Sequence, residues 1–140
     1  NNKGFIMAKI TDHQISGQVY AYGSVASNTN DGVKTLYPVA SVGITFNGTN
    51  SYTVVTKGIY AISAQQLMTT GAGATYFRID INGSPAKFGY IPGGTMADAI
   101  VQSMGELNTG DVIRIYQQNA INSAWEAQHS SFQIQLIKAT

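Results

Sequence analysis

Short segments in which apolar and polar residues alternate run through almost the whole 140-residue sequence, with turn residues every 8–12 positions. The clearest segment is Tyr76–Ile81, where Phe and Ile at the odd positions alternate with Tyr, Arg and Asp at the even ones. A period of two is that of a half-buried strand, and no stretch has the period of an amphipathic helix. The pattern therefore predicts an all-β sandwich or barrel.

Turn signals divide the chain into about ten expected strands. Asn82-Gly83 is the strongest hairpin signal, and Asn108–Asp111 and Asp31-Gly32 are further tight-turn sequences. The expected strands are Gly4–Ile10, Ser16–Val25, Val39–Phe46, Ser51–Val55, Ile59–Met68, Tyr76–Ile81, Ala86–Ile91, Met96–Glu106, Val112–Gln118 and Phe132–Leu136.

The composition supports an all-β chain and narrows its function. Ile and Val total 24 and Tyr 8, against 4 Leu, and β-branched and aromatic residues suit pleated surfaces. The absence of cysteine excludes disulfides, thiol catalysis and thiolate metal sites. A net charge of +1 gives no footprint for nucleic acid, and no apolar run is long enough to span a membrane.

Charged residues are only 11% of the sequence, well below the usual share of about 25%. Such a low charge indicates that copies of the chain cover much of its surface, although a virion or secreted protein rich in uncharged polar residues would have the same composition. We find no linker or composition shift and expect one domain over residues 1–140. The start at Asn1-Asn2-Lys3, without Met, predicts the C-terminal part of a longer fibrous protein.

Four motifs occur in the order and spacing of a known superfamily. They are a Gly-x-Tyr entering a strand within Lys57–Ile62, the Asn82-Gly83 hairpin, Leu-x-x-Gly-Asp at Leu107–Asp111 and Ser-Phe-x-Ile-x-Leu at Ser131–Leu136. From Tyr37 to Thr140 the chain resembles the tumour-necrosis-factor-like superfamily, and within it the globular heads related to the q subcomponent of complement component one. The resemblance implies a ten-stranded antiparallel jelly-roll sandwich that assembles as a homotrimer.

Two segments depart from that family's pattern. Tyr52–Lys57 lacks the proline often found there, and the loop from Asn28 to Tyr37 fits it poorly. Together with the absence of cysteine and the low charge, these departures make the chain resemble the bacteriophage versions, which are distal heads of tail fibres. Spore-surface glycoprotein heads of bacilli are the other bacterial relatives.

The residues that could carry catalysis are scattered. His13 and His129 are the only histidines, and no nucleophile motif accompanies them. Asp98 and Glu106 share a face of one expected strand but lie about 26 Å apart at 3.3 Å per residue, which is too far for a carboxylate pair. The sequence therefore predicts no enzyme and no cofactor. A pairing of Arg78 with Asp80 is expected as a surface ion pair.

A metal site is not expected either. Asn28, Asn30 and Asp31 alternate as calcium ligands do, but clusters of Asn, Asp and Gly are usually turns. Three copies of one histidine on a trimer axis are the remaining alternative. We expect chelators to leave the fold standing.

Outward tyrosines indicate where copies of the chain would meet. Tyr20, Tyr22, Tyr76 and Tyr116 occupy the polar positions of their expected strands. On a monomer they would leave many rings in water, and burying each recovers roughly 1.5–3 kcal/mol. We therefore predict that some of them line a threefold interface.

A long polar loop from Asn119 to Ser130 carries the only tryptophan, Trp125. An indole among amides and a carboxylate suits a sugar site, and the other candidate receptor-binding residues of this loop are Asn122, Glu126, Gln128 and His129. The alternative is that Trp125 only anchors the loop. The glycine-rich Thr69–Thr75 is a second adaptable loop.

These features predict an extracellular trimeric head of a phage tail fibre or similar surface appendage, which attaches to a cell-surface glycan or protein. Two other functions fit the same residues. One is a trimerisation cap that registers a fibrous stalk, including a collagen-like spore-surface stalk, without binding a receptor. The other is a secreted ligand of the complement or cytokine kind.

Overall fold

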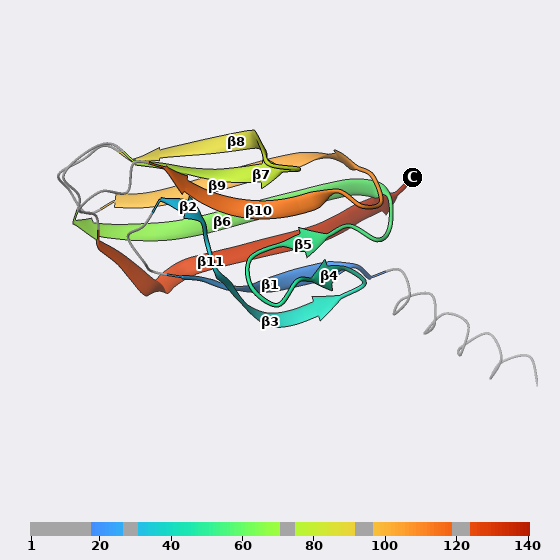
Figure 1. Ribbon diagram of the computed structural model, residues 1–140, viewed down its shortest axis with the longest axis horizontal. Helices are drawn as coiled ribbons and strands as arrows, with labels where there is room; N and C mark the ends of the chain where they lie inside the picture. Colours follow the sequence, from blue (N-terminus) through green and yellow to red (C-terminus); the bar gives the residue numbers. More distant parts are fainter. Residues whose placement is uncertain (1–17, 27–30, 71–74, 92–96, 119–123) are drawn as a thin grey trace, which may run out of the picture.

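The computed structural model describes residues 18–26, 31–70, 75–91, 97–118 and 124–140, and in them the fold is all-β and antiparallel. Two sheets pack face to face (Figure 1). The five-stranded sheet has the order β3 (Leu36–Val42), β1 (Tyr20–Val25), β11 (Ala124–Ala139), β6 (Gly58–Thr70) and β9 (Ala97–Leu107). The six-stranded sheet has the order β4 (Thr45–Phe46), β5 (Tyr52–Thr53), β10 (Val112–Gln118), β7 (Thr75–Ile81) and β8 (Ser84–Ile91), and β2 (Gly32–Val33) also pairs with β10.

Nine of the ten expected strands lie among these elements, and the prediction of an antiparallel two-sheet fold is confirmed. The described residues form eleven strands because Gly43, at φ +71°, divides the expected strand Val39–Phe46 into β3 and β4, and because β2 was not expected. The tenth expected strand, Gly4–Ile10, lies outside the described residues.

Aromatic rings from both sheets fill the core. Tyr52 lies 5.0 Å from Phe46 and 5.6 Å from Phe132 between ring centroids, so it joins the two sheets. The Tyr52 hydroxyl lies 2.8 Å from Ser41 Oγ, and the Tyr60 hydroxyl donates to the Thr56 carbonyl at 2.7 Å. Burial raises the pKa of both tyrosines, while these hydrogen bonds satisfy their polar ends.

The period of two that predicted the strands also predicted their buried faces. Phe132 and Ile134 are buried and Leu136 packs against them, as the closing motif indicated. Phe77 and Ile79 are fully buried on β7. Both sheets therefore direct the apolar side of each strand into one core.

Two of the motifs meet at one end of the sandwich. Asn82 and Gly83 have φ +54° and +79°, which suits a two-residue hairpin turn between β7 and β8. Asn82 Nδ2 donates to Asp111 Oδ1 at 2.9 Å, and the Asn108 amide donates to Asp111 Oδ2 at 2.8 Å. The tight turn expected at Asn108–Asp111 is thus closed by the Asp111 carboxylate, and these two hydrogen bonds lower its pKa.

The edge strand β3 carries a proline. Pro38 lies opposite Gly23 of β1, where the pairing of the two strands shifts by an irregularity next to Tyr22. Gly23 fits here because a Cβ would meet the Tyr37 backbone. Because proline has no N–H, it interrupts the row of backbone donors along this strand.

Gly58 is required where β6 meets the end of β11. A Cβ at this position would meet the Lys138 carbonyl oxygen and would lie 2.5 Å from Leu136 Cδ1. The Gly-x-Tyr motif thus combines a close backbone approach at Gly58 with a fully buried ring at Tyr60.

We expect Gly58→Ala to lower the free energy of unfolding by about 1–3 kcal/mol, because the added methyl overpacks the β6–β11 contact. Urea denaturation followed by circular dichroism measures the change. Gly105→Ala on β9 is the matched control, since a Cβ there meets nothing within 4 Å. Equal stability of the two variants would contradict the close-approach explanation.

Candidate functional site

The outer face of the five-stranded sheet carries a band of uncharged side chains. The band consists of three rows, and each row crosses all five strands. Residues that pair on neighbouring strands point to the same side of a sheet, so the strand registers define the rows. The rows are Val42, Tyr20, Gln135, Ala61 and Met104; Ala40, Tyr22, Gln133, Ser63 and Gln102; and Tyr37, Ser24, Ser131, Gln65 and Ile100. We call these fifteen residues the uncharged band.

Large apolar side chains of the band are open to solvent. Met104 is 70% exposed, and Ile100 and Tyr37 are each 57% exposed. Charged residues occur in the registers just beyond the band, at Glu106 and Lys138 on one side and at Asp98 and Glu126 on the other. Exposed apolar side chains of this size on an uncharged surface are typical of an interaction surface.

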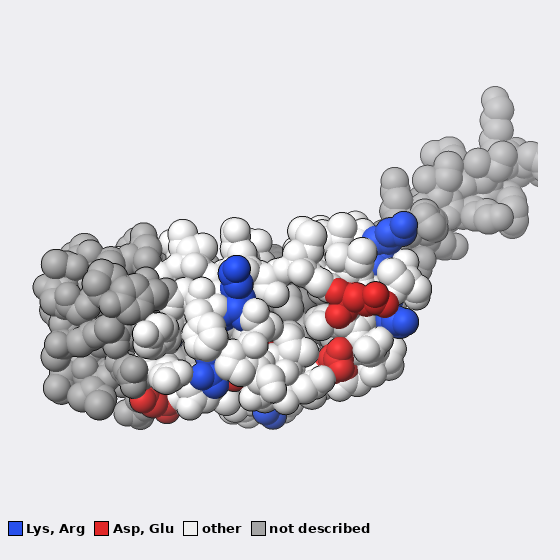
Figure 2. Space-filling model, turned by 90° about the horizontal axis from the view of Figure 1, so that it is seen from above, with Lys and Arg blue, Asp and Glu red and all other residues white. Residues whose placement is uncertain are grey.

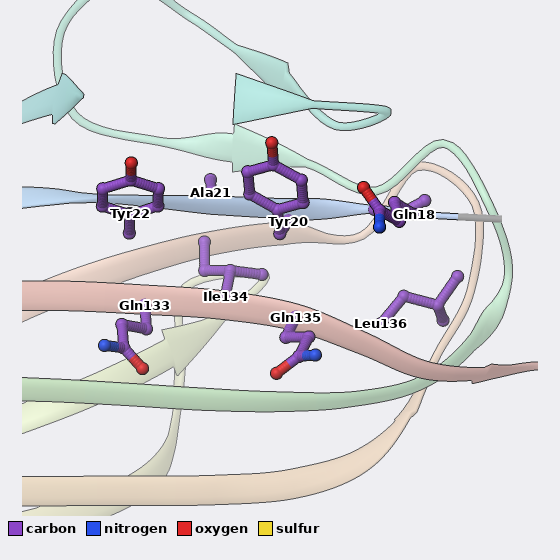
Figure 3. A pocket seen from close by; sticks show the side chains of 9 residues that line it. Gln18, Tyr20, Ala21, Tyr22, Gln133, Ile134, Gln135 and Leu136 are labelled. Carbon is purple, nitrogen blue, oxygen red and sulfur yellow. The ribbon is translucent and has the colours of Figure 1, made fainter. Parts of the chain in front are cut away.

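Hollows lie along the same face. One hollow, of about 480 Å³, lies between β1 and β11, and Tyr20 and Tyr22 stack beside it with ring centroids 6.3 Å apart. Figure 3 shows the two rings side by side on β1 and the amides of Gln133 and Gln135 along the neighbouring β11. A second hollow of about 390 Å³ extends the groove across β6 to Met104 on β9.

Charges are sparse elsewhere too. The face in Figure 2 is mostly uncharged, with a few acidic and basic side chains of both signs. Lys57 and Glu106, 3.3 Å apart, form an exposed ion pair.

The four tyrosines predicted at the interface divide into two pairs. Tyr20 and Tyr22 lie in the uncharged band, whereas Tyr76 and Tyr116 lie on the outer face of the six-stranded sheet. The two faces look in opposite directions, so one flat contact cannot include both pairs.

Arg78 lies beside Tyr116, one of the two tyrosines on the outer face of the six-stranded sheet. Its guanidinium lies 3.8 Å from the Tyr116 ring centroid and donates to both carboxylate oxygens of Asp80 at 2.7 and 3.2 Å. The side chains of Arg78 and Asp80 are only 15% and 5% exposed, so the pair is largely buried rather than the expected surface ion pair. Stacking on Tyr116 explains the burial, because the ring covers the guanidinium plane.

The tryptophan segment differs from its prediction. Residues 124–130 of the expected loop Asn119–Ser130 belong to β11, where Trp125 pairs with Met68 and Glu126 with Leu67. Gln128 and His129 fall where the pairing of β11 with β6 is irregular, between Glu126 and Ser131. Pairing with the long β6 explains the strand, since the polar sequence itself shows no period of two. Asn122 lies outside the described residues.

Two other predicted loops are described only in part. Of the three residues considered as calcium ligands, Asp31 is exposed, while Asn28 and Asn30 lie outside the described residues. His13 also lies outside them. Thr69 and Thr70 end β6 and Thr75 begins β7, with the glycine-rich centre between them also outside.

A buried polar cluster between the sheets was not predicted. Lys34 is 1% exposed, and its ammonium donates to Gln117 Oε1 at 2.6 Å. Gln66 Nε2 donates to the Ala26 carbonyl at 3.2 Å, and Gln66 Oε1 and Gln117 Nε2 have no hydrogen-bond partner. Burial lowers the Lys34 pKa to about 8. A lysine that follows a turn gives no sequence signal for burial.

In the described ranges, no three His, Asp or Glu side chains lie together as metal ligands would. No helix suited to crossing a membrane occurs in the same part of the chain.

The architecture is shared with solved structures. Crystal structures of murine APRIL at pH 8.5 and pH 8.0 align with TM-scores of 0.69 and 0.70, and both are 14% identical to this chain. A third, at pH 5.0, has a TM-score of 0.69 and 12% identity. Each alignment covers 86% of this chain and 99% of the APRIL chain. The fold is a tumour-necrosis-factor-like jelly roll.

At this level of identity the likeness concerns the fold alone. No family model matches the sequence, and no curated protein matches it. The jelly roll expected from the four motifs is confirmed, while the function has to be argued from the surfaces of this chain.

The buried Lys34 predicts an unusual pH dependence. Its folded pKa of about 8 lies below the ordinary 10.5, so the unfolded chain binds more protons between these values and stability rises with pH. Between pH 7 and 9.5 we expect the free energy of unfolding to increase by about 2 kcal/mol. Urea titrations at fixed protein concentration measure it. The range stops at pH 9.5 because burial raises the pKa of Tyr52 and Tyr60. Above about pH 10 the unfolded chain loses these tyrosine protons first, so the free energy of unfolding of the protein falls.

Lys34→Met should abolish this increase, whereas Lys87→Met, which removes an exposed lysine, should retain it. An unchanged pH slope in Lys34→Met would assign the dependence to another group.

Proposed function

We propose that the chain is the homotrimeric, non-enzymatic binding head of an extracellular appendage, and that it trimerises through the uncharged band. The observation that carries the proposal is the exposure of Met104, Ile100, Tyr37 and Tyr22 within the uncharged band of one sheet face. Covering each such side chain contributes roughly 1.5–3 kcal/mol, against the cost of association.

A threefold arrangement fits the form of the band. Its centre is rich in amides and hydroxyls, and Gln133 and Ser63 lie opposite each other there. Its borders hold the exposed apolar groups, with Tyr37 on the edge strand β3 and Met104 on the edge strand β9. A contact in which the β3 side of one copy meets the β9 side of the next is head-to-tail, and such contacts can close into a ring, which we propose to be a ring of three.

The likeness to murine APRIL supports a ligand-type head, and the resemblance to complement heads and phage fibre heads supports attachment to a cell surface. We place the chain at the tip of a phage tail fibre or a similar appendage, with a surface glycan or protein as receptor. A secreted ligand of the cytokine kind would use the same trimer. A trimerisation cap without a receptor is the structural alternative.

We expect the native protein to have three times the mass of one chain by light scattering at micromolar concentration. Gln133→Arg should reduce it to the mass of one chain, because three guanidinium groups would meet at the centre of the trimer without counter-ions. Thr45→Arg, an exposed position on the other sheet, is the control and should remain trimeric.

A single-chain mass for the unmodified protein would overturn the trimer. If the Gln133→Arg variant is trimeric and has unchanged thermal stability, the contact between copies must lie on another face.

The tryptophan prediction separates a binding head from a cap. If the strand position Trp125 serves the receptor, Trp125→Ala should reduce adsorption to target cells by about tenfold or more without changing the melting temperature. A lower melting temperature or a dissociated trimer would make Trp125 an anchor instead. Unchanged adsorption and unchanged melting would exclude the tryptophan segment from recognition.

A further inference from the structure

A second concave site lies on the outer face of the six-stranded sheet, away from the uncharged band. Tyr76, Phe88 and Gln118 line a hollow of about 480 Å³ there. The two rings meet edge to face, with centroids 6.0 Å apart and planes at 79°. Phe88 is 51% exposed.

The hollow is held in place by groups behind it. Arg78 Nη1 donates to Gln118 Oε1 at 3.0 Å, so the amide oxygen is used and the amide nitrogen is the end left to donate outward. Arg78 is fixed in turn between Asp80 and the Tyr116 ring, and its guanidinium lies 5.9 Å from the Phe88 ring centroid. The site is therefore preorganised by a central arginine, and binding would order few side chains.

The charge of the site restricts its ligand. The guanidinium is paired with both oxygens of Asp80, so the arginine offers no uncompensated charge to an anion. The other lining groups are two aromatic rings and an amide. Such a site suits a neutral molecule with apolar C–H faces and hydroxyl groups around its rim, which are the properties of a pyranose ring.

We propose that the hollow at Tyr76, Phe88 and Gln118 binds a neutral saccharide, with a sugar face on the Phe88 ring and a sugar oxygen accepting from Gln118 Nε2. The proposal rests on the binding-head function above and names its ligand class. Copies that meet through the uncharged band leave this hollow uncovered, since it lies on the opposite sheet. A trimer would thus present three identical sugar sites, and their combined avidity would exceed that of one.

The trimeric protein is tested on immobilised neutral oligosaccharides that present hexoses, N-acetylhexosamines and 6-deoxyhexoses, with sialylated and sulfated oligosaccharides beside them. Affinity for the best neutral oligosaccharide is then measured by calorimetry. Phe88→Leu, which keeps apolar volume but removes the ring, should weaken binding about tenfold. Phe88→Tyr should retain it, and Val55→Ala, which trims an equally exposed apolar side chain elsewhere, should not change it.

Melting temperatures and light scattering of each variant show that the trimer is intact, and Tyr76→Leu provides a second test if Phe88→Leu is unstable. Binding to none of the neutral oligosaccharides, or preference for the anionic ones, overturns the proposal. Equal binding by Phe88→Leu and Phe88→Tyr also overturns it, since an apolar protein contact rather than sugar stacking would then be present. A trimer that adsorbs to cells but fails on every neutral oligosaccharide retains the proposed function and loses only this site.

Discussion

The pairing of β11 between β1 and β6 is the contact on which the rest of the molecule depends. Its inward residues Phe132 and Ile134 are buried against the opposite sheet, while its outward residues Gln133 and Gln135 lie at the centre of the uncharged band. A register slip of one residue would exchange these two sets. Gly58 fixes the register at one end, because only a residue without a Cβ lets β6 approach Lys138 so closely.

The two outer faces of the sandwich have different chemistry although the strands alternate in the same way. The uncharged band of the five-stranded sheet presents exposed aliphatic groups and amides, whereas the six-stranded sheet presents Arg78 paired with Asp80 beside aromatic rings. A face that meets its own copies head to tail needs two borders that complement each other, and a face that meets a small ligand needs fixed donors. This difference supports assigning assembly to one face and recognition to the other.

The sequence predicts most of this fold because its signals are local. The period of two at Phe77 and Ile79 and the Asn82-Gly83 turn each act over a few residues, and both appear where they were expected. Features that depend on partners far along the chain were missed. The buried Lys34 donates to Gln117, 83 residues away, and Ala124, Trp125 and Glu126 lie in a strand because β6 extends far enough to pair with them. The candidate sites follow the same rule: the alternation of residues predicts which tyrosines point outward, but only the sheet order separates them into two faces.

Pro38 on the edge strand β3 bears on what happens to chains that have not yet assembled. An open strand edge is a template for indefinite growth, in which each added chain exposes a new edge for the next. A missing N–H and the irregular pairing beside Tyr22 interrupt that template on β3. Newly made chains are thereby hindered from stacking into fibrils through this edge.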